Sequence, residues 1–460
     1  MSSAGRAAHF SPRRRTAVIL AGEGTGAAYL VGAMRALDAA GVRIDVVLGR
    51  GAGAVVAAFS GLSAEDKIDG EGGLLDAVSS ERPFRIAPLY RFAAIALAIS
   101  FASFGAPLLL GLVSVVVLPI QALVRGLYPS AALANPGWLS YLVAAVEPYY
   151  LPAVALPLIV LFTALSVRAL RLSRRERLSA LFPPPFDLGP FDRLLSARLW
   201  EISRGTATDE RPRHRRALSE AYVKLLSSGF GQQGFREIVL YALDTDTGEE
   251  VPFVALKERF AKKMTSDLAE GGREAIDMTG DGAAVLFDTL RAAVTPPGLA
   301  PAVGIPLPRG AALGGEVHRF ASSLSMGGES LRDAVAAGAE QVFYVISSAS
   351  SNRVSGNLWE RISTAGLRAS LQRDLAWAAE KTDVPVFVVR PEFERLSPYE
   401  LQGRLQLGGG TLPPRALVDQ GARDVERLFV RPVLGEELSA IPREATVPID
   451  REWQAGPKEL

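Results

Sequence analysis

The chain has 460 residues, which is enough for two or three domains or for one large domain with an insertion. Its formal net charge is +1, so the charge balance does not point to nucleic acid as a partner. It has no cysteine and only three histidines, His9, His214 and His318, which are far apart in the sequence, so we expect no disulfide, no bound metal and no cofactor.

The N-terminal part of the chain predicts a strand, a glycine-rich turn, a helix and a second strand. Residues 1–15 are expected to be a disordered basic lead that contacts anionic lipid. Apolar residues 17–20 predict the first strand and residues 44–48 the second. The second strand ends with the spacing of a nucleophile elbow, G-x-S-x-G, in which a serine sits on a sharp strand-to-helix turn. The five residues are Gly49, Arg50, Gly51, Ala52 and Gly53, so a glycine stands at the serine position.

Two apolar stretches follow. Residues 92–124 contain no charged residue over roughly 33 positions, and residues 148–167 form a second run, whereas about 20 apolar residues span a bilayer. Arginines precede the first run at 82, 85 and 91 and follow the second at 168, 171, 174, 175 and 177, which by the positive-inside rule places both termini in the cytoplasm. We therefore predict a transmembrane helical hairpin over residues 91–170, whose first arm is one span or a broken, re-entrant pair. A buried pair of core helices is the alternative.

The rest of the chain predicts alternating strands and helices. Apolar runs at 237–243, 251–256, 341–347 and 384–389 read as strands, and 283–294 and 332–337 read as helices. This alternation favours an α/β fold with a largely parallel sheet. The expected organisation is two parts of one α/β domain (16–90 and 171–395) around the hairpin, followed by an irregular C-terminal extension (396–460).

These motifs resemble the patatin-like phospholipase family, whose members are lipid acyl hydrolases with a Ser-Asp dyad. The family's glycine-rich oxyanion loop reads G-G-G-x-R-G and is followed by A-Y-x-x-G. This chain keeps that spacing, with Ala28, Tyr29 and Gly32 after a loop formed by Gly22, Glu23, Gly24, Thr25, Gly26 and Ala27. Glu23 replaces the middle glycine and Gly26 the arginine. The resemblance implies a sheet with helices on both faces. A carboxylate in the loop and a missing arginine both work against an oxyanion.

The resemblance also implies where the two catalytic residues should be. The nucleophile position is Gly51. Counting back from Gly338 places the aspartate position at Ser322, and a gapped alternative places it in residues 326–328. Neither contains an aspartate. Asp281 begins a literal D-G-A motif, but it precedes the helix-to-proline segment at 290–307, which is the wrong order for the family.

With nucleophile, base and oxyanion loop all altered, we interpret the chain as a membrane-anchored pseudoenzyme that binds membrane lipid, acyl groups or a protein partner. Its oligomeric state is left open. One alternative is a working acyl hydrolase with a substitute nucleophile, for which Ser60, Ser322 and Ser325 are candidates. A second is an NADP-binding α/β protein, in which the glycines at 22 and 24 form a dinucleotide fingerprint and Arg50 faces a 2′-phosphate.

Overall fold

The computed structural model describes the chain in segments. They are residues 10–24, 26–80, 85–127, 155–163, 166–167, 184–204, 212, 214–307, 317–323, 329–348, 358–391 and 414–434. These residues divide into two compact units, one formed by residues 1–85 and 188–460 and the other by residues 86–187. The sheet and the candidate site belong to the first unit.

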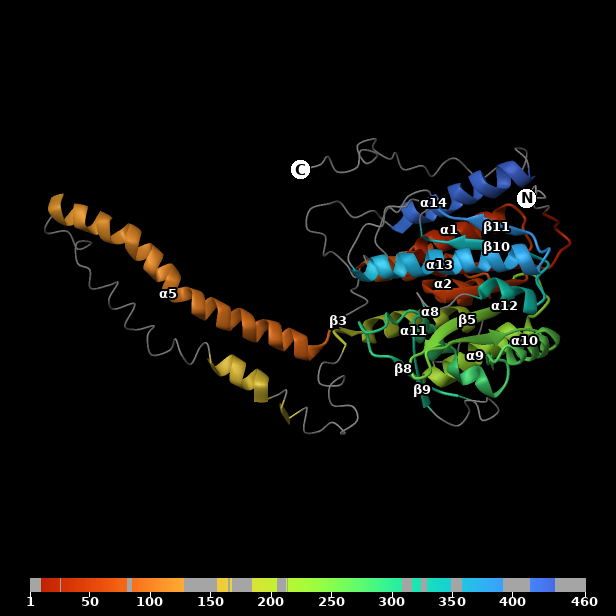
Figure 1. Cartoon of the computed structure of the whole chain (residues 1–460), viewed down its shortest axis with the longest axis horizontal. Helices are drawn as coiled ribbons and strands as arrows, with labels where there is room; N and C mark the ends of the chain where they lie inside the picture. The colour runs from red at the N-terminus through yellow and green to blue at the C-terminus, as the bar shows by residue number, and fades with distance from the viewer. Residues whose placement is uncertain are drawn as a thin grey trace. The chain divides into compact units, whose positions relative to one another are not determined.

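A nine-stranded sheet forms the centre of the first unit (Figure 1). Its main path runs in the order β11-β10-β1-β2-β5-β6-β7, and every pair from β11 to β5 is parallel. β6 pairs antiparallel with β5, and the β8–β9 hairpin joins β5 through β9. The strands are β1 (Thr16–Gly22), β2 (Val46–Gly51), β5 (Glu237–Asp244), β6 (Glu250–Ala255), β7 (Ile276–Asp277), β8 (Val303–Pro306), β9 (Val317–Ala321), β10 (Gln341–Ile346) and β11 (Val386–Val389).

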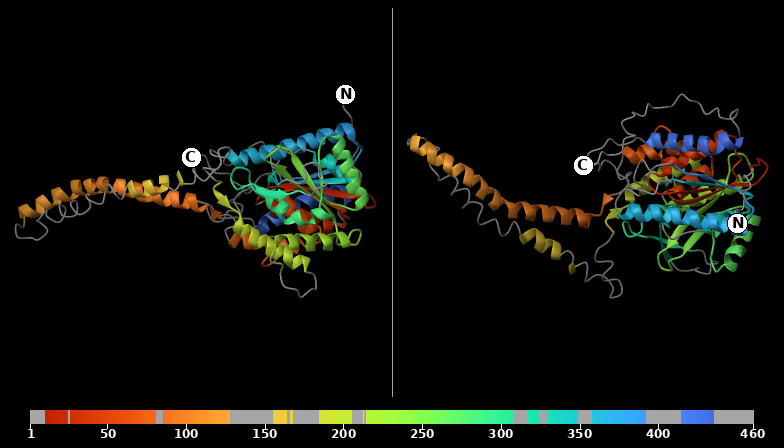
Figure 2. Two further views of the ribbon diagram at one scale, coloured as in Figure 1. Left: turned by 90° about the horizontal axis from the view of Figure 1, so that it is seen from below. Right: turned by 45° about the horizontal axis from the view of Figure 1, so that its top comes forward.

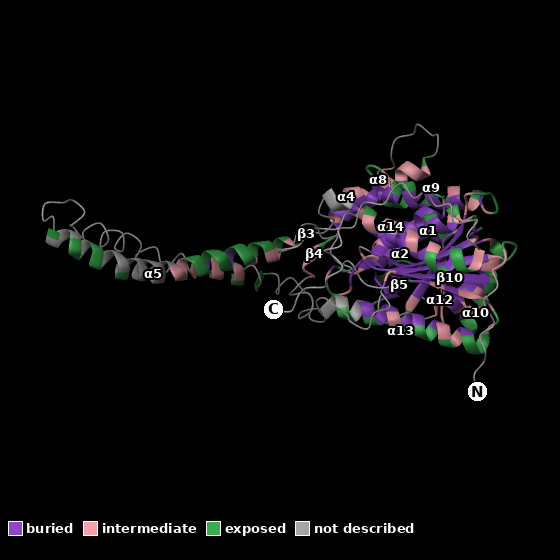
Figure 3. Cartoon of the chain, turned by 90° about the horizontal axis from the view of Figure 1, so that it is seen from above, coloured by how far each residue is buried: buried purple, intermediate pink, exposed green. Residues whose placement is uncertain are grey.

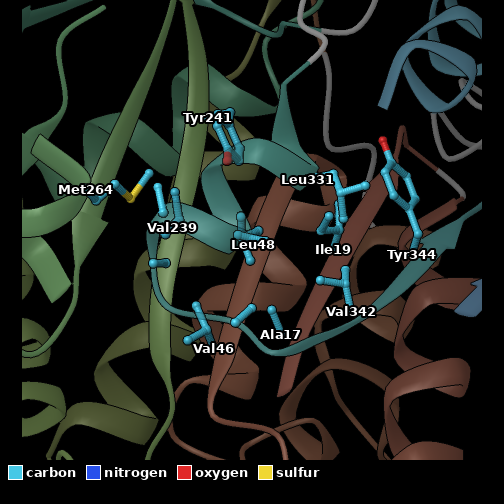
Figure 4. Packing of buried hydrophobic residues seen from close by; sticks show 14 of the residues in the cluster. Ala17, Ile19, Val46, Leu48, Val239, Tyr241, Met264, Leu331, Val342 and Tyr344 are labelled. Atoms are coloured by element: carbon cyan, nitrogen blue, oxygen red, sulfur yellow. The ribbon is translucent and has the colours of Figure 1, made fainter. Parts of the chain in front are cut away.

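The central strands form where the sequence has short, nearly continuous apolar runs. Every residue of β1, β2, β5 and β10 is buried, which is the pattern of parallel strands covered on both faces. On one face, Ile19, Leu48 and Tyr241 pack with Leu331 in a cluster that Figure 4 shows from close by. This shared burial explains why apolar runs alone located these strands.

Helices cover both faces of the sheet, as Figures 2 and 3 show from further sides. One face carries α1 and α2, and the other carries α10, α12 and α13. The helices of the first unit are α1 (Gly26–Ala39), α2 (Ala52–Ser60), α3 (Asp66–Asp69), α4 (Leu74–Ser80), α8 (Gly189–Ser203), α9 (Arg215–Ser228), α10 (Glu258–Glu270), the 3-10 helix η2 (Asp281–Val285), α11 (Leu286–Ala293), α12 (Ser330–Ala336), α13 (Leu358–Lys381), α14 (Pro414–Val425) and the π-helical segment η4 (Glu426–Leu434).

Both ends of the described chain pack on this unit. Phe10, expected within a disordered lead, makes edge-to-face contacts with Phe343 of β10, Phe387 of β11 and Phe429 of η4. The C-terminal extension was expected to be irregular, yet α14 packs on α1 so closely that a Cβ atom on Gly32 would collide with the backbone of Val418. Gly421 meets the backbone of Tyr29 in the same way. The two glycines allow the helix backbones to touch.

The second unit begins within β3 (Arg85–Ile86) and contains α5 (Pro88–Leu127), helical residues at 155–163 and 166–167, and β4 (Phe186–Asp187). β3 and β4 pair as a two-stranded sheet. The described side chains of α5 are mostly exposed or intermediate (Figure 3).

The predicted transmembrane hairpin is wrong. Among the residues that the structure describes, no helix combines the length and the apolar character needed to cross a membrane. The prediction relied on the absence of charged residues from the two runs, and that absence does not by itself make a helix a membrane span.

Two further predictions depended on those spans. The fold class is corrected to a mixed α/β fold with a mostly parallel sheet and helices, without a membrane hairpin. The predicted multi-pass localisation with both termini in the cytoplasm is wrong for the same reason.

Candidate functional site

The candidate site lies at the carboxyl ends of three adjacent parallel strands. Glu23 follows β1, Gly51 ends β2, and Ser347 follows β10. β2 pairs with one edge of β1 and β10 pairs with the other, so the order of the strands reverses at β1. Open α/β sheets bind ligands at such a reversal of strand order.

The turn from β2 into α2 has the geometry of an elbow. Gly51 has φ 59° and ψ −130°, a conformation that side-chain-bearing residues adopt only with strain. The flanking glycines permit close contact, because a Cβ on Gly49 would lie 2.5 Å from Cα of Ala54. A Cβ on Gly53 would collide with the carbonyl of Leu20 in β1. The spacing identified in the sequence therefore corresponds to a tight strand-to-helix turn.

Glu23 fills the space above Gly51. A Cβ built on Gly51 would lie 2.5 Å from Cδ of Glu23 and closer still to its Oε1 atom. It would also lie 2.5 Å from the carbonyl oxygen of Gly22. The carboxyl group of the altered loop thus occupies the volume that the side chain of a serine at position 51 would need.

Ser322 completes this arrangement. It directly follows β9, and its amide donates to the carbonyl of Thr295 at 2.8 Å. Its hydroxyl donates to Oε1 of Glu23 at 3.0 Å. The residues expected at the nucleophile and aspartate positions therefore both lie at Glu23, although 299 positions separate Glu23 from Ser322.

The environment favours the neutral form of the Glu23 carboxyl. Glu23 and Ser322 are 3% and 1% exposed. Burial raises the pKa of Glu23 well above its usual value, and the hydrogen bond from Ser322 opposes this only in part. Among the described residues, no cation pairs with this carboxyl group.

The altered loop uses its own amides to close its turn. The amide of Gly26 donates to the carbonyl of Glu23 at 2.7 Å, and that of Ala27 donates to Gly24 at 3.1 Å. At the family's arginine position, Gly26 packs so tightly that a Cβ there would meet the side chain of Ser347. Thr25 lies outside the described residues. The two bonded amides are not free to stabilise an oxyanion in this conformation.

Arg50 points away from this site, into the opposite face of the sheet. It is buried, forms an ion pair with Glu250, donates to Ser370 at 2.6 Å and lies over the ring of Tyr241. A guanidinium committed to these partners is not available to a 2′-phosphate. The NADP-binding alternative therefore loses the cation on which it depended.

The remaining candidate residues do not join this site. Ser60 is the last residue of α2, so the length of that helix separates it from Gly51. Its backbone carbonyl accepts a hydrogen bond from Arg236. Asp281 is exposed in η2, which packs against α9. Ser325 and the alternative aspartate position at 326–328 lie outside the described residues.

Two features of this region were not predicted from the sequence. Ser347 lies against the loop glycines 22 and 26, and its position directly after a buried strand was an available signal. His318 pairs with Asp244, Nδ1 to Oδ2 at 2.8 Å, and Asp246 lies near enough for the three to form a possible cation-binding group. His318 and Asp244 are 74 positions apart in the sequence, so no local motif could indicate that they pair.

No protein-family model matches the sequence, and no curated protein matches it. Among solved structures, the chain is similar to the crystal structure of VipD from Legionella pneumophila, with 11% sequence identity and a TM-score of 0.32 over 90% of this chain and 67% of VipD. A likeness of this size does not assign the chain to a family.

Proposed function

We propose that this chain is a patatin-like α/β protein that binds lipid acyl groups and does not turn over esters through its elbow. The observation that carries the proposal is the position of the Glu23 carboxyl over Gly51. A glycine supplies no nucleophile, and the space for one is filled.

The surrounding groups support the loss of turnover. Ester hydrolysis develops negative charge on the carbonyl oxygen, which needs aimed amides or a cation. Here two loop amides close their own turn, and the arginine position is Gly26. Loss of a serine nucleophile alone lowers turnover by about a millionfold in a serine hydrolase.

The second unit supports lipid as the partner. Nearly all exposed large apolar side chains of the described residues lie between Ile86 and Val167, the exceptions being Val317 and Leu428. Phe101 and Val115 are the most exposed of them. Concentrated apolar exposure of this kind marks an interaction surface, and acyl chains match its lack of charge.

Two assays test the proposal. Purified protein is incubated with phospholipid and short acyl esters, and we expect no steady release above a heat-denatured control. Gly51→Ser alone should not restore turnover, because Glu23 and Ser322 remain. Steady turnover by the unmodified protein would refute the absence of hydrolysis.

Lipid binding is measured by co-sedimentation with phospholipid vesicles. Phe101→Ser with Val115→Ser should reduce the bound fraction severalfold. The matched control, Val317→Ser with Leu428→Ser, removes two exposed apolar side chains outside the second unit and should bind as the unmodified chain does. Equal binding by both double variants, or no binding by the unmodified chain, would reject lipid as the partner.

A further inference from the structure

Ser322 and Glu23 form a hydroxyl–carboxyl pair in which the two chemical roles have exchanged places. The carboxyl oxygen lies over the elbow, at the family's serine position, and the hydroxyl lies at the family's aspartate position. The hydrogen bond between them, 3.0 Å from Oγ to Oε1, has the length required for direct proton transfer from a serine to its base.

We propose that Ser322 is a nucleophile that accepts an acyl group from an activated ester, with Glu23 as its base, in a single turnover. This inference goes beyond the proposed lipid binding and does not depend on it. The proposed nucleophile is the Oγ atom of Ser322, whereas the elbow has no nucleophile because residue 51 is a glycine.

The step balances without a cofactor. The Oγ atom of Ser322 attacks the ester carbonyl carbon and its proton passes to Oε1 of Glu23. The bond from the carbonyl carbon to the leaving oxygen then breaks, and the leaving alcohol takes the proton from Glu23. The products are one free alcohol and a chain esterified at Ser322.

Glu23 acts as a base only in its ionised form, so its surroundings set the pH at which the step proceeds. Helix α2 begins beside the Glu23 carboxyl and has no side-chain cap at its N-terminus, so its positive end favours the ionised form. Burial acts in the other direction and raises the pKa of Glu23, so acylation should accelerate as the pH rises. The hydroxyl of Ser323, the next residue in the chain, is buried without a hydrogen-bond partner.

The same surroundings explain why the reaction should stop after one acyl group. Among the described residues no cation faces the pair, and the two loop amides are already bonded. An ester on Ser322 also removes the hydroxyl that held Glu23. A deacylating water would therefore lack both orientation and charge stabilisation.

The test uses the full chain with a long-chain alkyl fluorophosphonate and, separately, p-nitrophenyl decanoate. We expect a burst of about one equivalent of nitrophenolate without steady release, and a phosphonyl adduct that peptide mass spectrometry places on Ser322. Ser322→Ala should remove both signals. Glu23→Gln should slow labelling by about a hundredfold or more. Ser60→Ala, which changes another buried serine, should label as the unmodified chain does.

A second variant covers the case in which Glu23→Gln does not fold. The chain has no cysteine, so Ser322→Cys introduces one thiol, and Ser60→Cys provides the matched buried control. Iodoacetamide should modify the thiol of Ser322→Cys at least tenfold faster, because the Oγ atom of Ser322 is hydrogen-bonded to a carboxyl group that can accept the proton, whereas the Oγ atom of Ser60 has no such partner. An adduct on another residue, no adduct on the unmodified chain, or equal thiol reactivity at both positions would overturn the proposal. Vesicle binding is measured in parallel, so loss of lipid binding is distinguished from failure at Ser322.

Discussion

The carboxyl group of Glu23 lies where the side chain of residue 51 would stand in a serine elbow. Cδ of Glu23 is 2.5 Å from the Cβ position built on Gly51, and Oε1 is closer. The two residues are thus sterically coupled, since a larger residue at 51 requires that the carboxyl group move. The absence of a side chain at Gly51 leaves the space that the Glu23 carboxyl group fills.

This coupling predicts the effect of a methyl group at position 51. Gly51→Ala should destabilise the protein by about 2 kcal/mol more than Gly41→Ala. Both glycines have positive φ, at 59° and 73°, but nothing lies within 4 Å of a Cβ on Gly41. Chemical denaturation of both variants measures the excess destabilisation at Gly51.

Glu23→Ala in the Gly51→Ala background is the complementary measurement. It should recover part of the excess destabilisation, with a coupling energy of about 1 kcal/mol in a double-mutant cycle, because the carbonyl oxygen of Gly22 still lies 2.5 Å from the added Cβ. Additive effects would show that the two side chains do not compete for one space.

The sequence predicted the central strands and the elbow because both are local. Buried parallel strands are apolar runs, and the elbow is a five-residue spacing. The contact between Glu23 and Ser322 is tertiary, so no spacing encodes it. Helix α14 was not predicted, because Gln420, Gly421 and Asp424 lie on its buried face. These residues interrupt the regular spacing of apolar residues by which an amphipathic helix is identified.

The close packing of α14 on α1 predicts that either contacting glycine is sensitive to a methyl group. Gly421→Ala should lower the free energy of unfolding by about 2–3 kcal/mol, because its Cβ would enter the backbone of Tyr29. Gly105→Ala, which also lies inside a helix (α5) and has nothing within 4 Å of its Cβ position, is the control and should not lower the free energy of unfolding. Similar losses for both variants would contradict the close contact.

Asp374 predicts a pH-dependent stability. It lies under the sheet, accepts a hydrogen bond from Tyr344 at 3.0 Å, and burial raises its pKa to about 6. A raised carboxyl pKa contributes stability below the unfolded-state value of about 4, and this contribution is lost as the pH rises through about 6. Above that pH the folded chain holds a buried carboxylate.

Asp374→Asn should therefore stabilise the chain at pH 8 by up to about 3 kcal/mol, while its amide oxygen still accepts from Tyr344. The advantage should shrink by about 1 kcal/mol at pH 5, where most of the native aspartate is protonated. Urea unfolding of both proteins at pH 5 and pH 8 measures this difference. If the stability advantage of Asp374→Asn instead grew as the pH fell, the pKa of Asp374 would not be raised in the folded chain.

The group formed by Asp244, Asp246 and His318 should not bind a metal ion, although its ligand atoms lie within 4.8 Å of one another. Each carboxylate oxygen already accepts a hydrogen bond. The Oδ1 atom of Asp244 accepts hydrogen bonds from the amides of Asp246 and Thr247, and its Oδ2 atom is hydrogen-bonded to His318. Both carboxylate oxygens of Asp246 accept hydrogen bonds from Arg319. A cation would have to compete with the guanidinium of Arg319 for the charge of Asp246. We expect Ca²⁺, Mn²⁺ or Zn²⁺ at about tenfold molar excess to change the melting temperature by less than about 1 °C, and EDTA to have no effect. A rise of several degrees that Asp246→Asn abolishes would identify a site, because Asn keeps the volume of Asp246 and loses the charge that a cation needs.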